Sequence, residues 1–268
     1  MNSNRSLFIV QSFYALFLSR STGFVNRTLD RRLDGNSIAW LWPLAWLPND
    51  ISALSLWVLC GTLLVANFLV VIFPRFFLLR ALAAISVFML GAAANSFGQI
   101  SHSDLTWVLI AVALTFLPFF EGGKRYKFML CAQALLLATY FTSGVWKALS
   151  FAKAMFSPGF LEKLAATLPE IIAHSISGEG AVPRAVAATL GSWPLISSAL
   201  WIVAILFQLS TVFWLLRPDR ARLWGALIIL FHATNMMILG FQFVAPMLLA
   251  FFIFFIWPEF EEKSLASG

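Results

Sequence analysis

The chain has 268 residues, of which 60% are hydrophobic and only 11% are charged. Soluble globular domains contain about 45–50% apolar and about 25% charged residues, so this composition excludes an ordinary soluble domain and predicts an integral membrane protein. The net charge of +6 comes from short clusters of Lys and Arg between apolar segments, which is typical of cytoplasmic loops and not of a nucleic-acid-binding face. We therefore expect membrane lipid, and no nucleic acid, among the partners.

The first segment, from Leu7 to Ser19, is an apolar core behind a weakly basic start. It is similar to a secretory signal, but no small-residue cleavage site follows and Arg20 comes next. We predict a retained first helix that extends towards Val25. Residues 26–51 are predicted to form a charged loop, which ends in a tryptophan-rich stretch, Trp40 to Trp46, along a membrane interface.

Seven further apolar runs follow, and each is close to the roughly 20 residues that a helix needs to cross the hydrocarbon core. They cover residues 53–73, 78–98, 104–120, 127–147, 192–216, 222–240 and 242–257. The sequence therefore predicts an all-α fold, a polytopic bundle of about eight transmembrane helices plus interfacial helices, in a single transmembrane domain over residues 1–268. Residues 153–190 are more polar and contain several Pro and Gly, so we expect an outward-facing connection with an interfacial helix around 158–174.

Basic residues in the short connections predict the orientation, because cytoplasmic loops are enriched in Lys and Arg. Every second connection carries them: Arg75 and Arg80, then Lys124, Arg125 and Lys127, then Arg217, Arg220 and Arg222. We expect these loops and both termini in the cytoplasm. The connections around 99–103 and 240–242 have no Lys or Arg and are expected outside. Four arginines between residues 20 and 32 disagree with this orientation, although Asp30 and Asp34 partly offset their charge.

Polar side chains inside membrane helices are costly, so the ones this sequence keeps are candidates for function. They are Asn67, Asn95, Gln99, His102, Gln133, Tyr140, Lys147, Gln208, His232 and Asn235. The strongest group ends the fifth predicted span, where Tyr140, Gly144 and Lys147 fall at i, i+4 and i+7 on one helix face and Ser143 lies beside Lys147. The alternative is that Lys147 only extends its ammonium to the interface from a helix end.

Two histidines add to these candidates. His102 starts the fourth predicted span and is expected to reach the same outer half of the bilayer as Lys147, which would allow a shared cavity. Alternatively it is a bystander, because Ser101 and Asp104 around it have the spacing of a capping box.

His232 lies about halfway along the seventh predicted span, with Asn235 at i+3 on the same face. The alternative is that both side chains only form hydrogen bonds between helices. A metal site is not expected, because the three histidines have no ligand spacing and no Cys or carboxylate joins them. Cys60 and Cys131 lie inside predicted spans and are expected to be packing residues.

The stretch Tyr140-Phe-Thr-Ser-Gly-Val-Trp-Lys-Ala-Leu149, followed by Phe156-Ser-Pro-Gly159, resembles a pattern of the HTTM family. Two other stretches agree in order: Asn95 to Pro118, in which His102 and Ser103 open a helix, and Leu206 to Ile256, with Phe231-His-Ala-Thr-Asn235. This family comprises the membrane domain of vitamin K-dependent gamma-carboxylases and many smaller bacterial proteins. The resemblance implies an integral protein of the bacterial cytoplasmic (inner) membrane.

In the carboxylases, the lysine matching Lys147 is the base that deprotonates reduced vitamin K, and the histidine matching His102 assists in the same cavity. The resemblance implies a quinol of this type as cofactor. The candidate catalytic residues are therefore Lys147, His102 and His232, and the candidate cavity residues are Tyr140, Ser143, Gly144 and Asn235. A lysine acts as a base only where its amine is neutral, which the apolar setting favours.

This sequence also departs from the family pattern. Phe156 stands where the family has tryptophan, Ala148 to Ala152 replace polar residues, and no counterpart of the large lumenal domain that holds the protein substrate is found. Carboxylation of a protein is therefore not expected.

Two functions remain open at this stage. The first is an enzyme, or a subunit of one, whose outward-facing lysine/histidine site handles a quinone-like or lipid-soluble substrate together with a partner protein. The second is a non-catalytic membrane accessory or maturation factor for a secreted peptide or another membrane protein. A transporter is not indicated, because no internal repeat or matching pair of broken helices is found.

Overall fold

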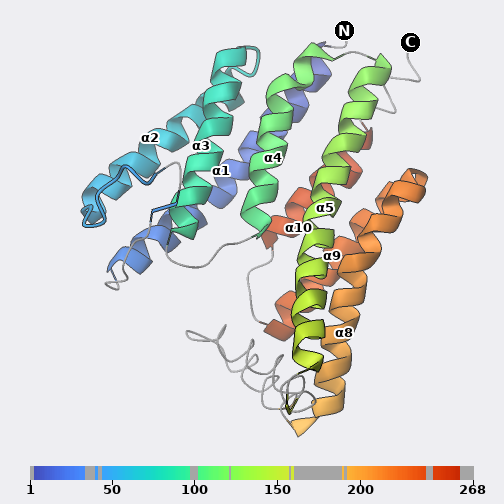
Figure 1. Ribbon diagram of the computed structural model, residues 1–268. Coiled ribbons are helices and arrows are strands. Elements are labelled where there is room, and N and C mark those ends of the chain that lie inside the picture. The colour runs from blue at the N-terminus through green and yellow to red at the C-terminus, as the bar shows by residue number, and fades with distance from the viewer. Residues whose placement is uncertain are drawn as a thin grey trace. The chain divides into compact units, whose positions relative to one another are not determined.

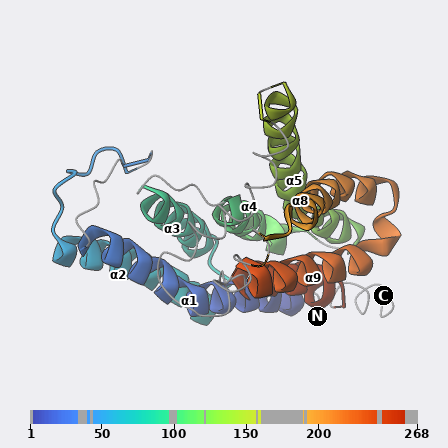
Figure 2. The same cartoon turned by 90° about the horizontal axis from the view of Figure 1, so that it is seen from below.

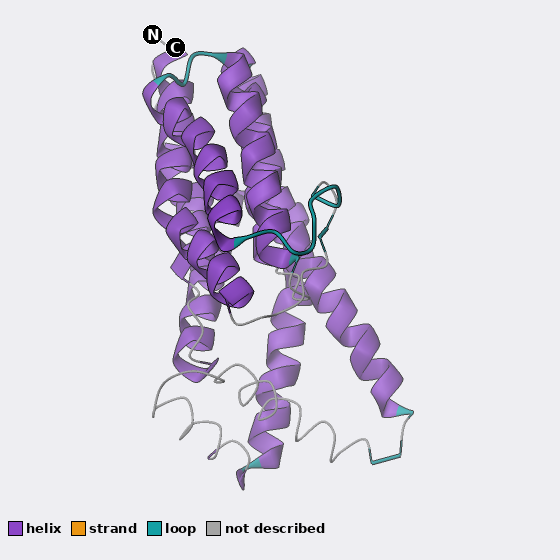
Figure 3. Cartoon of the chain, turned by 90° about the vertical axis from the view of Figure 1, so that its left-hand side faces the viewer, coloured by secondary structure: helices purple, strands orange, loops and turns teal. Residues whose placement is uncertain are grey.

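The computed structural model describes residues 3–33, 40–41, 44–96, 102–120, 122–156, 158–159, 189, 192–239 and 244–259. Every regular element in these ranges is a helix, which confirms the all-α prediction for this part of the chain (Figure 1 and Figure 3). Three of these helical stretches are long and apolar enough to cross a membrane: Ala53–Ile72, Gly123–Lys153 and Leu195–Leu216. They support an integral membrane protein, whereas the predicted total of eight spans stays a prediction.

The chain divides into two compact units, Met1–Leu135 with Ile256–Gly268 and Leu136–Phe255. The prediction of a single transmembrane domain stays a prediction. The elements of the first unit are α1 (Ser3–Leu33), α2 (Ala53–Ile72), α3 (Phe77–Asn95), α4 (His102–Phe116), η1 (Leu117–Phe119) and the first turns of α5 (Gly122–Met155).

In the first unit, α1 packs against α2, α2 against α3 and α3 against α4, and Figure 2 shows these four helices beside one another. Apolar side chains on the inner faces drive this packing. Phe13 and Phe17 of α1 lie 5.3 and 5.7 Å from the Trp107 ring, between ring centroids, and all three side chains are buried. The guanidinium of Arg20 lies 5.2 Å from the centroid of the same Trp107 ring.

The start of the chain differs from the prediction. A charged loop was expected from residue 26, but α1 continues through the arginines to Leu33. Arginine is a good helix former, so polarity alone does not end a helix. Trp40 is buried and donates from Nε1 to the Pro48 carbonyl at 2.9 Å, while Trp46 is exposed, as an interfacial tryptophan should be.

Arg80 also differs from its predicted place in a cytoplasmic loop. Its side chain is 1% exposed and lies at the first turn of α3. It donates to the carbonyls of Pro74, Arg75 and Thr115 at 2.6, 3.0 and 3.0 Å. These carbonyls lie at or just beyond the C-terminal ends of α2 and α4, where helix dipoles favour a cation. Arg125 is likewise buried, in the first turns of α5.

The second unit contains the rest of α5, then α8 (Pro194–Ser210), η2 (Thr211–Leu216), η3 (Pro218–Arg220), α9 (Ala221–Leu239), α10 (Val244–Phe251) and all but the last residue of the π-helical turn η4 (Phe252–Ile256). Helices α9 and α10 pack together, and in η4, directly after α10, the Cβ of Phe254 lies so close to Gly225 that an added Cβ there would collide with it. Only glycine permits this approach. Between η2 and α9, Arg217 and Asp219 form an exposed ion pair at 3.1 Å, and the hydrogen bond from Arg217 lowers the pKa of Asp219 below its ordinary value.

Helix α5 is longer than the predicted span of 127–147. It starts at Gly122 and continues to Met155, so Lys147 lies inside the helix and not at its end. The run after Lys147 is rich in alanine, the best helix former, which explains the continuation. Residues 153–155 thus belong to α5, and the interfacial helix predicted at 158–174 lies outside the described residues, apart from Pro158 and Gly159.

Candidate functional site

The candidate site lies in the second unit, where α5, α8 and α9 meet. Its first element is the amine of Lys147 on α5, which donates from Nζ to Oε1 of Gln208 on α8 at 2.9 Å. The same Nζ lies 5.5 Å from the centroid of the Trp201 ring, which is two turns before Gln208 on α8. A cation in this position is attracted by the ring quadrupole. The lysine is therefore held by two neutral groups.

The second element is a buried pair between α5 and α9. The hydroxyl of Tyr140 lies 2.5 Å from Nε2 of His232, and the two rings meet edge to face with centroids 5.6 Å apart. Both side chains are at most 9% exposed. A neutral imidazole accepts a hydrogen bond at one ring nitrogen, so the phenol is the donor when Nε2 carries no proton.

Two phenylalanines form an aromatic wall next to the histidine. The rings of Phe207 on α8 and Phe231 on α9 stack at 4.7 Å, and Phe231 meets His232 edge to face at 5.5 Å. Aromatic pairs of this kind add about 0.5–1.5 kcal/mol beyond the area that they bury. The wall joins α8 to α9 and gives the imidazole an apolar surrounding.

Gly144 explains why the lysine reaches α8. A Cβ at this position would lie 2.8 Å from the Cβ of Gln208 and 2.9 Å from the backbone nitrogen of Leu209, closer than side chains approach. The helices therefore touch at this notch. The hydroxyl of Thr211, one turn after Gln208, also joins the two helices. It lies 3.2 Å from the Leu137 carbonyl on α5 and 2.7 Å from the Gln208 carbonyl on α8.

The predicted helix face is thus found in the structure. Tyr140, Gly144 and Lys147 all contact the neighbouring helices, and they sit at i, i+4 and i+7 on α5. Seven residues of helix place the phenol and the amine about 10 Å apart along the axis. In the described part of the chain no carboxylate contacts Lys147, so its hydrogen-bonding partner carries no charge.

The remaining predicted residues are not joined to this cluster by contacts. Ser143 and Asn235 are half-buried on α5 and α9, and neither makes a hydrogen bond within the described ranges. His102 is the first residue of α4 in the other unit, and its side chain lies outside what the structure describes. The prediction that His102 and Lys147 share a cavity stays a prediction.

Gln208 was among the polar candidates but was not assigned to the lysine site, and Trp201 was not predicted as a site residue. The available signal was the amide of Gln208 inside an apolar span, together with a spacing of seven residues that places it on the same face of α8 as Trp201. Neither feature indicates a partner on α5, which is 61 residues away along the chain. Among the described residues no group of three or more His, Cys, Asp or Glu side chains could hold a metal ion.

Comparison of this chain with family models, with curated proteins and with solved structures finds no match.

Proposed function

We propose that this chain is an integral membrane protein in which Lys147 acts as a base toward a quinone-like or other lipid-soluble substrate, together with a partner protein. The observation that carries the proposal is the hydrogen bond from Nζ of Lys147 to Oε1 of Gln208 at 2.9 Å. An amide oxygen accepts a hydrogen bond from an ammonium and from a neutral amine alike. Gln208 therefore holds the nitrogen in place in both protonation states, whereas a carboxylate would fix the charged form.

The proposed step transfers one proton. The neutral amine takes a proton from an acidic O–H or C–H group of the substrate, which leaves the substrate as an anion and Lys147 as an ammonium. The Trp201 ring, with its centroid 5.5 Å from Nζ, stabilises the ammonium that results. Tyr140, about two turns away on the same face of α5, and its partner His232 on α9 provide a second hydrogen-bonded pair for a polar group of the substrate.

The resemblance to the HTTM family supports the same reading, because it assigns the base to the lysine at this position of the sequence. About eight spans, an outward-facing site, a bacterial inner-membrane location and a quinol cofactor belong to this proposal. So do the assisting role of His102 and the contributions of Ser143 and Asn235.

A non-catalytic accessory or maturation factor is the second candidate, and one observation favours it. Lys147 with Gln208 and Tyr140 with His232 each join two helices, which is what purely structural hydrogen bonds in membranes do. On this reading the polar groups stabilise the bundle and the partner binds elsewhere.

The substitution Lys147→Arg separates the two candidates. Arginine keeps a cation at this position but is not deprotonated at any accessible pH. If Lys147 is a base, the variant is inserted at normal levels and fails to restore whichever process is lost on deleting the gene. Lys153→Arg, the same change at an exposed position on the same helix, is the matched control and should restore it. Full function of Lys147→Arg would eliminate the base and leave the accessory protein.

A further inference from the structure

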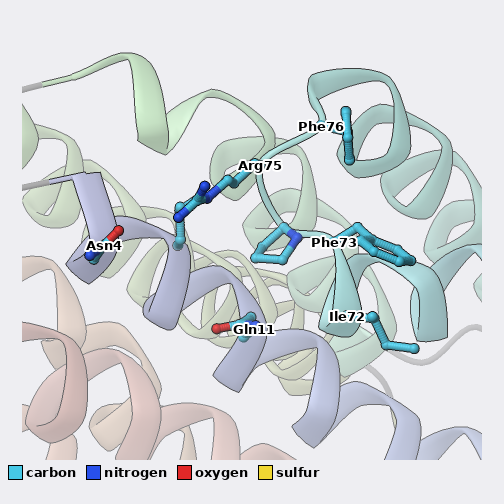
Figure 4. Close-up of a pocket in the computed structure, with 8 residues that line it drawn as sticks. Asn4, Gln11, Ile72, Phe73, Arg75 and Phe76 are labelled. Atoms are coloured by element: carbon cyan, nitrogen blue, oxygen red, sulfur yellow. The ribbon is translucent and has the colours of Figure 1, made fainter.

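A hollow of about 490 Å³ lies in the first unit where α1 passes the turn between α2 and α3. Figure 4 shows it between the polar side chains of α1, Asn4 and Gln11, and the residues of the turn. Leu7 completes the α1 side, and Ile72, Phe73, Pro74, Arg75 and Phe76 form the other. The lining is therefore mixed, with two amides and one guanidinium set in an apolar wall.

The turn that forms one wall is held from behind. Arg80 donates to the carbonyls of Pro74 and Arg75, and its guanidinium lies 5.9 and 5.6 Å from the ring centroids of Phe77 and Phe119, which contact each other. These bonds fix the backbone of the turn without using the side chain of Arg75.

The opposite wall is fixed to the end of α2. Gln11 donates from Nε2 to the carbonyl of Val71 at 2.8 Å, which ties α1 to the last turn of that helix. Its Oε1 atom remains available as an acceptor. Hydrogen bonds thus hold both walls of the hollow, α1 and the turn after α2, in fixed positions.

No carboxylate in the described part of the chain is paired with the positive charge of Arg75. Arg75 is exposed and makes no ion pair or hydrogen bond through its side chain within the described residues, and Figure 4 shows that side chain reaching over the hollow toward α1. The sequence contains no Asp or Glu from residue 1 to 29 or from 51 to 103, the stretches that supply both walls. Arg80, buried behind the turn, adds a second cation. The electrostatic field of the hollow therefore favours an anion.

The hollow also lies beside the end of a helix that is long and apolar enough to cross a membrane, which is the level at which lipid phosphates are expected. Helix α2 is apolar and long enough to span a membrane, and it ends at Ile72, three residues before Arg75. Ile72, Phe73 and Phe76 are 49%, 47% and 61% exposed, so apolar surface continues outward from the guanidinium. An apolar wall beside a cation at the end of a span matches an amphiphile with an anionic head.

We propose that this hollow binds the headgroup of an anionic glycerophospholipid, with the phosphate on Arg75 and an acyl chain along Ile72, Phe73 and Phe76. Guanidinium and phosphate form paired hydrogen bonds, and Asn4 supplies a further N–H donor at the rim. The Oε1 atom of Gln11 accepts from a headgroup hydroxyl, which favours a glycerol headgroup. An ethanolamine headgroup would place an ammonium near Arg75 with no carboxylate to receive it.

The test is native mass spectrometry of the full chain in mild detergent, titrated with phosphatidylglycerol, phosphatidylcholine and phosphatidylethanolamine that have identical acyl chains. We expect one phosphatidylglycerol to bind at least about tenfold more tightly than either other lipid, and Arg75→Gln to lower its affinity about tenfold, a loss typical of one charge-assisted contact. Arg75→Lys keeps the charge but loses the paired donors, so its affinity for phosphatidylglycerol should lie between those of the unsubstituted chain and Arg75→Gln. Arg220→Gln, the same loss of charge at an exposed position of η3, is the matched control and should bind as the unsubstituted chain does.

Three results would each overturn the proposal. The first is unchanged phosphatidylglycerol binding in Arg75→Gln. The second is an equal loss of phosphatidylglycerol affinity in Arg220→Gln, which would mean that the overall surface charge, and not a site at Arg75, attracts the lipid. The third is displacement of the lipid by glycerol 3-phosphate at equal concentration, which would make this a site for soluble phosphates and not for lipid. Thermal unfolding of each variant in the same detergent should match that of the unsubstituted chain, because the Arg75 side chain holds no element in place.

Discussion

Nζ of Lys147 and Oε1 of Gln208 lie 2.9 Å apart, and this contact joins α5 to α8 directly beyond the notch at Gly144. Without the amide of Gln208, the amine of Lys147 would lose its hydrogen-bond acceptor inside the helix bundle. Without the notch at Gly144, the two helices would stand too far apart for the bond. Substitutions at the amide and at the notch therefore test activity and stability separately.

The first prediction concerns the charge of the acceptor. Gln208→Glu keeps the size of the side chain but places a carboxylate against the amine, which stabilises the ammonium and prevents it from taking up a proton. We expect a folded protein, at least as stable as the original, that loses the function restored by the unsubstituted gene. Complementation of a deletion strain and thermal unfolding in detergent measure the two effects. Retention of function with a carboxylate at residue 208 would contradict a role for the neutral amine.

The second prediction concerns the notch. Gly144→Ala places a methyl group 2.8 Å from the Cβ of Gln208 and 2.9 Å from a backbone nitrogen, so α8 must move. Overpacking of this kind usually costs about 1–3 kcal/mol, and thermal unfolding in detergent should show the loss. Gly61→Ala is the control, because no atom lies within 4 Å of an added Cβ there, and alanine favours helix by up to about 1 kcal/mol. Equal stability of the two variants would mean that α5 and α8 do not approach at Gly144.

The third prediction concerns the buried arginine of the first unit. Arg80→Met removes all three hydrogen bonds to the carbonyls of Pro74, Arg75 and Thr115, while the side chain still packs beside the rings of Phe77 and Phe119. Hydrogen bonds to charged groups contribute about 1.5–3 kcal/mol each, part of which offsets the cost of burying the cation, so we expect a net loss of about 2–4 kcal/mol. Chemical or thermal unfolding measures it. Arg75→Met, five residues earlier, should leave the midpoint of unfolding unchanged. A similar loss of stability in both variants would argue against a stabilising role for the three hydrogen bonds of Arg80.

The fourth prediction concerns the orientation in the membrane. A reporter that works only in the cytoplasm should be active when fused after Lys124, and a reporter that works only after export should be active when fused after Asp104. The reason is that the basic connections are expected in the cytoplasm. Asp104 lies in the first turn of α4 and Lys124 lies beyond its last residue, so the two fusions must report opposite sides if that helix spans. An exported signal from the Lys124 fusion would invert the orientation and turn the proposed site toward the cytoplasm.

Helix positions could be predicted from this sequence because long apolar runs are strong signals. The run at 53–73 became α2 at Ala53–Ile72, and the run at 222–240 became α9 at Ala221–Leu239. Helix ends were less predictable, as α5 shows. An apolar run reports where a chain avoids water, whereas a helix ends where its backbone is capped, and nothing caps α5 at Lys147.

The contacts of the polar residues were predictable only in part. The spacing of Tyr140, Gly144 and Lys147 follows from helix geometry alone, so one shared face could be predicted. The partners Gln208 and His232 lie 61 and 92 residues away along the chain, and only tertiary packing selects them. The position of Arg80 was predicted wrongly for the same reason, because the carbonyls that accept its hydrogen bonds come together only in the folded protein.

The length of α5 has a consequence for the membrane itself. A helix of 34 residues rises about 51 Å, whereas the hydrocarbon core of a bilayer is about 30 Å thick. Such a mismatch is relieved by tilting the helix or by leaving its ends in the headgroup layer, and the balance shifts with bilayer thickness. Lys147 lies in the last third of this helix. If α5 spans the bilayer as proposed, we expect a thicker bilayer to draw the amine deeper and a thinner one to bring it nearer to water. The protonation of the proposed base would then depend on the acyl-chain length of the surrounding lipids.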